Sequence, residues 1–470
     1  MQVSNSNSRI RIISVHSIAD PEALCQQLMS RCLKGEIRRS YDLEWKDHQY
    51  RFGGDWLTGQ ALDLIRLDGL NANDMANKLQ QFETSLNSPS TENPLGLDLS
   101  FGYYHRNISK YNPGIPIRFH KCGLVYSASS VVLCWVDVSL ESEDPECWTD
   151  FISVVGKRQG ADYLKNFLDR EGTRCTQAEI FQKIENWFFR DLNPSDILYT
   201  SRNLYRFGRF KLQTESTLDA LKFLYLSTGD SENYEALALM AEENTKNTND
   251  IRWSWSMDAV SSVLQISSVH LQTKGAARFQ NSFRFADSWL TYVISLTQYH
   301  LMIDMERDIV RTMMTMHQIR RKKNPFSVLL GVIRMKKSYE EIMDRFMDSY
   351  WKLGLIQIHS HAERHALFLG LQTTLGCQDM VSRFHSKLST LGAFLLEKQK
   401  GVVGWFLIYV PFVSLLLGLL GINVKGITSE EGLSLFTLIS TLIAITATYL
   451  LVIAVSRNWL TSSKRAHCKR

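Results

Sequence analysis

Residues 401–424 read GVVGWFLIYVPFVSLLLGLLGINV, and residues 432–455 read GLSLFTLISTLIAITATYLLVIAV; neither run contains a charged residue. An α-helix of this length extends about 36 Å, which exceeds the roughly 30 Å hydrocarbon core of a bilayer. We therefore expect two transmembrane helices. A pair of helices buried in a protein core is the alternative for such apolar runs.

The charges that flank the two runs predict their orientation. Lys398 and Lys400 precede the first run, and the tail after the second carries five basic and no acidic residues: Arg457, Lys464, Arg465, Lys469 and Arg470. The connector 424–431, VKGITSEE, holds one Lys and two Glu. Since basic flanks favour the cytoplasmic side, we expect a multi-pass protein of the cell (inner) membrane with both termini in the cytoplasm. The polar start MQVSNSNS, unlike a secretory signal, agrees with this.

A short motif stands at the expected outer end of the first run. Gly421-Ile422-Asn423 follows Pro411 by about three helical turns. In this position the sequence resembles the CorA family of two-span divalent-cation transporters, which carries Gly-Met-Asn at the same place and, in its zinc-transporting branch, Gly-Ile-Asn. The resemblance covers roughly residues 375–470, about a fifth of the chain.

The resemblance implies a homo-oligomer, a pentamer in this family, with the first span lining a pore for Mg, Zn, Co or Ni. Gly421, Ile422 and Asn423 would then form the ion filter, and Ser414 is the polar pore-lining candidate. A ring of Asn423 oxygens could hold the water shell of a divalent cation. In isolation, Asn423 is better explained as a helix C-cap than as a filter group. The expected cofactor is none beyond the transported cation.

Together with the remaining chain, these runs predict the fold class. We expect an α+β cytoplasmic N-terminal domain, then long helices that form a stalk, and then a C-terminal two-helix transmembrane hairpin, so that the chain is mostly α overall. The expected domains are a cytoplasmic α/β domain (1–145), a cytoplasmic helical domain (146–337), a long stalk helix (338–400), the first transmembrane helix (401–424), an outer loop (425–431), the second transmembrane helix (432–455) and a basic cytoplasmic tail (456–470).

Apolar periodicity gives the elements inside these domains. Alternating or β-branched runs predict strands over 9–14, 62–67, 97–103, 117–126 and 131–140. Helical spacing predicts helices over 19–33, 159–170, 176–192, 215–226, 233–245, 259–274 and 285–322, ahead of the stalk.

Composition excludes several classes of function. The chain has 53 Lys and Arg and 48 Asp and Glu, a net charge of +5, and the five basic residues of the tail account for all of it. Because nucleic-acid binding needs a broad cationic surface, we expect no nucleic-acid partner. The eight cysteines form no C-x-x-C pair and predict reduced thiols. No P-loop, G-x-G-x-x-G turn or G-x-S-x-G elbow appears, and we expect no enzymatic activity.

Three groups of polar residues are candidate regulatory sites. His361 and His365 stand four apart and would share a helix face suited to zinc, with a solvated polar stripe as the alternative. Asp304 and Asp308 are candidate cation ligands between subunits, or ordinary acidic residues of a helix surface. The basic run Arg320, Arg321, Lys322 and Lys323 is a candidate site for lipid headgroups or a nucleotide, or simply the charged end of a helix.

Two functions remain open from the sequence. The first is a CorA-like homo-oligomeric channel or transporter for divalent cations, gated by a cytoplasmic domain that senses a metal or a small molecule. The second is a membrane effector on the same scaffold, opened by a cytoplasmic nucleotide-type signal in signalling or defence. In both, the partners are further copies of the chain and the lipid bilayer.

Overall fold

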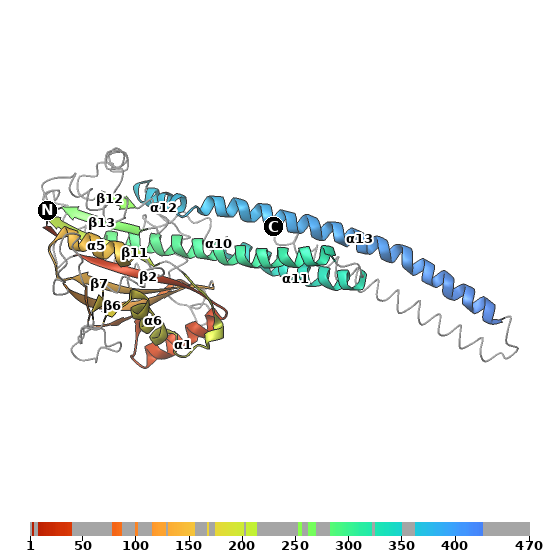
Figure 1. Cartoon of the computed structure of the whole chain (residues 1–470), viewed down its shortest axis with the longest axis horizontal. Helices are drawn as coiled ribbons and strands as arrows, with labels where there is room; N and C mark the ends of the chain where they lie inside the picture. The colour runs from red at the N-terminus through yellow and green to blue at the C-terminus, as the bar shows by residue number, and fades with distance from the viewer. Residues whose placement is uncertain are drawn as a thin grey trace. The chain divides into compact units, whose positions relative to one another are not determined.

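The computed structural model describes part of the 470-residue chain (Figure 1). Its described residues are 2–3, 8–39, 78–86, 99–101, 115–127, 130–155, 167–168, 174–201, 204–213, 252–255, 262–268, 283–321, 325–349 and 362–425. The chain divides into two compact units. The sheet unit comprises Met1–Arg307 and Asp344–Phe384, and the helical unit comprises Asp308–Met343 and His385–Arg470.

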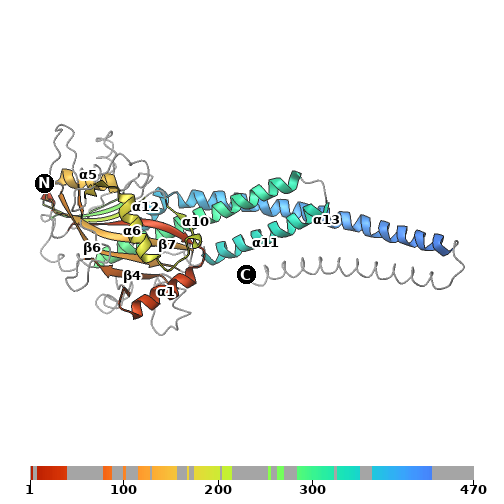
Figure 2. The same cartoon turned by 60° about the horizontal axis from the view of Figure 1, so that its bottom comes forward.

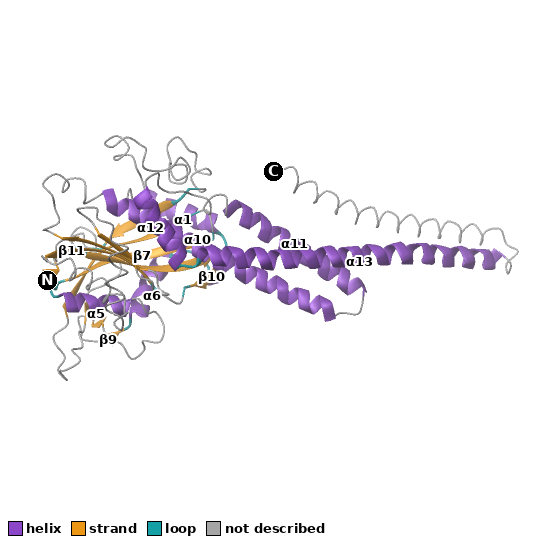
Figure 3. Cartoon of the chain, turned by 90° about the horizontal axis from the view of Figure 1, so that it is seen from above, coloured by secondary structure: helices purple, strands orange, loops and turns teal. Residues whose placement is uncertain are grey.

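One large β-sheet forms the sheet unit, and Figure 3 shows its strands in orange. Its described strands are β1 (Gln2–Val3), β2 (Arg9–Ile18), β3 (Arg38–Arg39), β4 (Gln80–Ser85), β5 (Leu99–Phe101), β6 (Ile115–Tyr126), β7 (Val131–Leu140), β8 (Phe167–Leu168), β9 (Arg174–Cys175), β10 (Ile197–Thr200), β11 (Tyr205–Gln213), β12 (Arg252–Trp255) and β13 (Ser262–Ser268). The order along the main path is β12-β13-β11-β2-β7-β6-β5-β8-β9. Among the described pairs, β11 with β13 is parallel and the others are antiparallel.

The helices with described bounds are α1 (Pro21–Leu33), α5 (Pro145–Val155), α6 (Gln177–Phe188), α10 (Phe283–Arg321), α11 (Pro325–Ser349), α12 (Ala362–Thr374) and α13 (Cys377–Lys425), with a 3₁₀ turn at Pro194–Asp196. Capping side chains start two of them. Asp20 accepts a hydrogen bond from the Ala23 amide at the start of α1, and Thr176 and Glu179 form a capping box at the start of α6. Gly376, at φ +65°, separates α12 from α13 in a backbone conformation that favours glycine.

The strand pattern places an apolar layer on one face of the sheet. Because successive side chains of a strand point to opposite faces, the even-numbered positions of β2 and β7, such as Ile10, Ile12, Cys134 and Val136, share one face. Side chains of α1, α5 and α6 join them in a single apolar cluster that includes Leu24, Leu28, Trp148, Phe151, Phe181 and Ile184. Figure 2 brings these three helices forward.

The odd-numbered positions face α10 and are far more polar. Arg11 and Ser17 of β2 and Asp137 of β7 lie on this face, all buried. Trp289 and Tyr292 of α10 pack against Phe207 of β11, with ring centroids 5.3 and 5.5 Å away. The first part of α10, residues 283–307, therefore covers a sheet face on which charged and aromatic side chains mix.

In the helical unit, buried side chains recur at helical spacing. On α10 they include Ile309, Met316 and Ile319, and on α13 they include Leu388, Leu391 and Phe394. The spacing of three or four residues marks the face that each helix turns inward. Other apolar side chains of the helical unit are exposed, such as Met314 of α10 and Leu330 of α11.

The expected fold class is wrong. Among the helices within the described residues, none has the length and apolar content needed to cross a membrane. The described part is instead a mixed α/β structure with a largely antiparallel sheet and helices, whereas the expectation was a mostly α chain ending in a transmembrane hairpin. The uncharged residues 401–424 were expected to form a separate transmembrane helix. They instead belong to one helix that begins at Cys377 and carries charged residues over its first half. Residues 432–455 lie outside the described residues.

Long-range strand pairing explains two further differences. Residues 259–274 were expected to be helical, but Ser262–Ser268 form β13, paired in parallel with β11. Residues 159–170 were expected to be helical, but Phe167–Leu168 form β8, paired with β5. The sheet therefore continues past residue 145, where the α/β domain was expected to end. The range 338–400 holds parts of α11, α12 and α13, with residues 350–361 outside the described part.

Candidate functional site

The predicted filter residues lie near the end of α13. Gly421, Ile422 and Asn423 are helical, and the helix ends at Lys425. Asn423 thus lies inside the helix, two positions before its end, rather than at the residue that caps it. Ser414 is nine positions earlier, which is two and a half turns of a regular α-helix. The two positions are half a turn out of phase, so Ser414 and Asn423 fall on opposite sides of α13.

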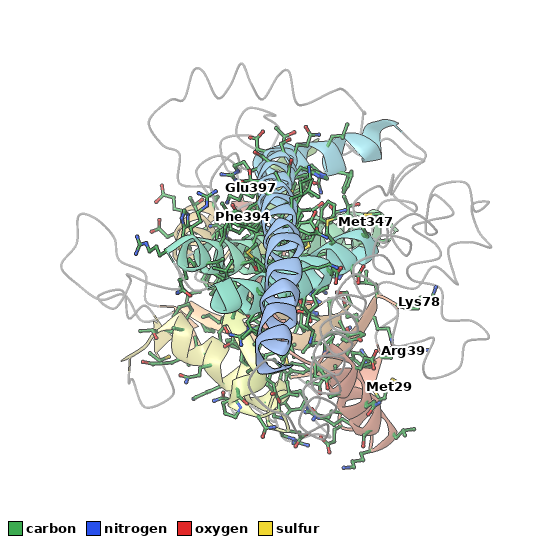
Figure 4. The ribbon with its side chains drawn as sticks, turned by 90° about the vertical axis from the view of Figure 1, so that its right-hand side faces the viewer. Met29, Arg39, Lys78, Met347, Phe394 and Glu397 are labelled. Atoms are coloured by element: carbon green, nitrogen blue, oxygen red, sulfur yellow. The ribbon has the colours of Figure 1, made fainter. Side chains whose placement is uncertain are left out.

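The basic run begins at the end of α10. Arg320 and Arg321 are its last two residues and both are exposed, while Lys322 and Lys323 lie outside the described residues. The Arg320 guanidinium lies 5.1 Å from the ring centroid of Phe394, which Figure 4 labels on α13. Basic side chains at a helix C-terminus complement its dipole, and a cation over an aromatic ring is attracted to its face. Arg320 therefore has a structural partner within the helical unit.

Asp304 of α10 is buried against the sheet rather than exposed to a neighbouring subunit. Its Oδ2 accepts hydrogen bonds from the hydroxyls of Ser17 and, at 3.3 Å, Ser130. Its Oδ1 lies 3.3 Å from Arg307 Nη1. Both oxygens of the Asp304 carboxylate thus already have partners, two hydroxyl donors and a guanidinium. Asp308, in the helical unit, lies 3.6 Å from Arg311 Nη1.

The histidine pair cannot be placed as a unit. His365 belongs to α12, while its side chain and all of His361 lie outside the described part of the chain. Within the described residues, no group of three or more His, Cys, Asp or Glu side chains could hold a metal ion.

Sequence reasoning missed a buried ion pair at the centre of the α10 face. Arg11 Nε donates to Asp137 Oδ1 at 2.7 Å, and Arg11 Nη2 donates to Asp137 Oδ2 at 3.0 Å. The guanidinium lies between two indoles, 3.9 Å from the ring centroid of Trp135 and 4.2 Å from that of Trp289. The two-point geometry and the aromatic faces compensate for desolvation of the charges. The signal in the sequence was an Arg inside one expected strand and an Asp inside another.

A second missed cluster surrounds His16 on the other face. His16 Nε2 lies 2.9 Å from Ser14 Oγ and 3.3 Å from Glu185 Oε1, while Nδ1 lies 3.1 Å from Thr200 Oγ1. A nucleophilic triad needs the acid and the hydroxyl on different ring nitrogens. Here Ser14 and Glu185 share Nε2, and Ser14 is fully buried, while the hydroxyl on the other ring nitrogen is that of Thr200. The cluster instead joins α6 to β2 and β10.

A third buried histidine lies on α10. The His300 Nε2 and the Tyr205 hydroxyl are 2.8 Å apart, and the rings meet edge to face. Burial, assisted by nearby His16, lowers the pKa of His300 to about 3. Burial also raises the pKa of Tyr205. Both side chains are therefore neutral near pH 7, and one proton lies between them.

No family model matches the chain, and a search of curated proteins found no match either.

Proposed function

We propose that the chain is a homo-oligomeric channel or transporter for divalent metal cations, gated by its sheet unit. The observation that carries the proposal is the Gly421-Ile422-Asn423 tripeptide at the end of α13, after a run with no charged residue from position 401. This is the feature by which the sequence resembles the CorA family. The membrane part of the proposal rests on the amino-acid sequence alone.

In this proposal, α13 contributes one copy of Asn423 per subunit, and symmetry assembles the copies into a ring. Carboxamide oxygens accept hydrogen bonds from the water shell of a divalent cation, which Mg²⁺ gives up reluctantly. A closed ring of subunits is required because one chain cannot enclose a pore. We propose a pentamer in the cell membrane, with both termini in the cytoplasm and with no cofactor other than the transported ion.

The sheet unit and the basic end of α10 would supply the regulation. Arg320 and Arg321 are exposed, and their N–H groups suit phosphate or another anion. This observation also supports the second candidate, an effector of the same architecture that a cytoplasmic nucleotide opens.

A flux assay tests the proposal. The purified chain is reconstituted into liposomes, and uptake of Mg²⁺, Zn²⁺, Co²⁺ and Ni²⁺ is followed by stopped flow. We expect flux of at least one ion, which Asn423→Ala abolishes without changing the size of the oligomer. Ser389→Ala, at an exposed position of α13, is the matched control and should conduct normally. Absence of flux for all four ions would overturn the proposal.

The same liposomes separate the two candidates. The channel should conduct without nucleotide, whereas the effector should conduct only when a cyclic or adenylated nucleotide is added. Nucleotide-dependent flux that Arg320→Glu with Arg321→Glu eliminates would establish the effector.

A further inference from the structure

One large apolar side chain at the end of α1 points away from the core. Leu24, Leu28 and Arg31 of α1 are buried, whereas Leu33, the last residue of the helix, is 89% exposed. Leu33 follows Leu24 by nine positions, or two and a half turns, so the two side chains lie on opposite sides of α1. A single exposed leucine is common on protein surfaces, and its surroundings decide what it means.

The chain after Leu33 is held in a defined turn. The Lys34 amide donates to the Ser30 carbonyl at 3.1 Å, and Gly35 follows at φ +73°, a conformation that favours glycine at a helix end. The turn leads into β3, which pairs with β4 alone among the described strands. Leu33 and Lys34 are therefore presented in a fixed position beside an edge strand of the sheet.

Basic side chains surround Leu33. Lys34 is exposed beside it, and β3 consists of Arg38, which is 64% exposed, and Arg39. Successive residues of a strand point to opposite faces of the sheet, so these two arginines carry positive charge to both sides of the edge. Burial raises the pKa of the Cys32 thiol on α1, and nearby Arg39 opposes this shift. Arg39 thus lies close to the last turn of α1. We call residues 33–39 the α1 end segment.

The acidic residue inside the α1 end segment is already balanced by other arginines. Glu36 Oε2 lies 3.2 Å from Arg31 Nε and 2.6 Å from Arg190 Nη2. Asp191 Oδ2 lies 3.5 Å from Arg190 Nε. These two acidic and two basic side chains balance one another, so they leave the charges of the segment's own basic residues in place.

A second carboxylate beside the segment is shared by two cations. Glu83 Oε1 lies 2.8 Å from Arg38 Nη2 and 3.0 Å from Lys121 Nζ. With the contacts above, six basic side chains meet three acidic ones, a surplus of three positive charges: Arg31, Lys34, Arg38, Arg39, Lys121 and Arg190 against Glu36, Glu83 and Asp191. Outside its basic tail the sequence is balanced in charge, so the fold creates this surplus.

We infer that the α1 end segment is a docking surface for an anionic lipid bilayer, with the edge strand β3 toward the headgroups and Leu33 in their interfacial layer. Basic side chains near such a surface are attracted to its phosphate groups. Insertion of the leucine removes its apolar area from water. An acidic protein segment would match the charges, but a projecting leucine needs a complementary pocket on a protein, whereas a fluid bilayer supplies apolar surroundings without one.

The inference rests on the proposed function for the presence of a bilayer beside the chain. Attachment of the same chain to the membrane raises the effective concentration of headgroups, so a weak contact of this surface is enough to hold it there. Ion conduction is not needed for docking.

Hydrogen exchange of the full chain in lipid nanodiscs, followed by mass spectrometry, tests the inference. The discs contain phosphatidylcholine alone or with about one third phosphatidylglycerol. The Lys34 and Gly35 amides are hydrogen-bonded, so their exchange is slow enough to follow. We expect peptides covering 29–39 to exchange about fivefold more slowly in the anionic discs, and we expect about 0.5 M NaCl to remove most of this difference.

Two variants at exposed positions identify the contact. Leu33→Asp and Lys34→Glu should each reduce the difference between the discs to less than about twofold. Lys337→Glu, the same charge change at an 80% exposed position of α11, is the matched control and should retain it. Equal exchange in the two kinds of disc, or wild-type protection in both variants, would overturn the inference. Protection by soluble polyglutamate but not by anionic discs would overturn it in favour of an acidic protein partner.

A failure of the proposed function shows separately from a failure of docking. Asn423→Ala should lose ion flux but keep the lipid-dependent protection of 29–39. If the chain does not enter nanodiscs, it is mixed with preformed vesicles of the same two compositions, and the same exchange comparison decides whether the α1 end segment docks.

Discussion

Asp137 of β7 and Arg11 of β2 are joined by two hydrogen bonds, although 126 residues separate them in the sequence. The pair is buried, with Arg11 only 3% and Asp137 7% exposed, and it lies directly opposite in the register of the two strands. Its position under Trp289 links the sheet to α10. A buried ion pair contributes little net stability but is costly to break from one side, because the other charge is then left alone.

Replacing Arg11 tests this asymmetry. Arg11→Met keeps much of the packing of the side chain against the indoles but leaves the Asp137 carboxylate unpaired, and it should reduce the free energy of unfolding by about 3–5 kcal/mol. The double variant Arg11→Met with Asp137→Leu removes both charges and should be more stable than the single variant. Urea unfolding measures both. If the double variant loses as much unfolding free energy as the two single variants together, the ion pair is not the cause of the loss in the single variant.

Gly123 of β6 accommodates the neighbouring Trp135. A Cβ at this position would overlap the Trp135 ring and lie 2.5 Å from the Phe82 carbonyl oxygen. Gly123→Ala should therefore lower the free energy of unfolding by about 1–3 kcal/mol through overpacking, seen as a lower urea midpoint. Unchanged stability would mean that the indole can move aside, which the Arg11 guanidinium stacked on it opposes.

Local patterns correctly predicted the strands and helices whose own residues show alternating or helical apolar spacing. Residues 9–14, 117–126 and 131–140 were expected to be strands and belong to β2, β6 and β7, and α1, α6 and α10 lie where helical spacing indicated. Within the helix expected over 259–274, the described residues Ser262–Ser268 form a strand, because their Val and Ile residues suit either structure and the pairing with β11 decides.

The chemistry of the site was harder to predict, because it depends on distant parts of the chain. From the sequence, Asp304 was a candidate cation ligand between subunits or an ordinary acidic residue of a helix surface, but Ser17 and Ser130 approach it across 287 and 174 residues of sequence. No local pattern contains that contact. For the expected transmembrane hairpin, residues 401–424 are helical but continue a helix that begins at Cys377, and no helix of the described residues is long and apolar enough to cross a membrane.

Two histidines, the buried His300 and the half-buried His120, predict acid sensitivity. Burial is the main cause that lowers the pKa of His300 to about 3 and that of His120 to about 4, and nearby Arg9 also lowers the latter. An unfolded histidine binds its proton below about pH 6.5. Between pH 6.5 and about 4, the unfolded chain therefore binds more protons than the folded chain, and stability falls as the pH falls.

Urea midpoints at pH 7, 6, 5 and 4 should show this loss, and His300→Gln should reduce its slope. The exposed His317→Gln is the control and should follow the wild type. Because carboxylates titrate in all three proteins, the difference between the curves is the quantity to compare. Parallel curves for His300→Gln and the wild type would contradict the prediction.

Gly331 of α11 allows close approach to Ile319 of α10 within the helical unit. A Cβ at Gly331 would lie 2.7 Å from Ile319 Cγ1 and 3.0 Å from Cδ1. Alanine gains about 1 kcal/mol over glycine in helix propensity, whereas overpacking costs about 1–3 kcal/mol, so Gly331→Ala should be neutral to destabilising.

The combination with Ile319→Ala separates these two effects. Once the isoleucine branch is gone, only the gain in propensity remains, so Gly331→Ala should stabilise the Ile319→Ala background by about 1 kcal/mol. Gly401→Ala on α13, where no atom of the described residues lies within 4 Å of the added Cβ, should give the same gain without a second change. Thermal unfolding of the wild type, the two single variants, the double variant and this control measures the coupling between the two positions. If the effects of Gly331→Ala and Ile319→Ala simply add, the two side chains do not interact, and the close approach of α10 and α11 at this point is wrong.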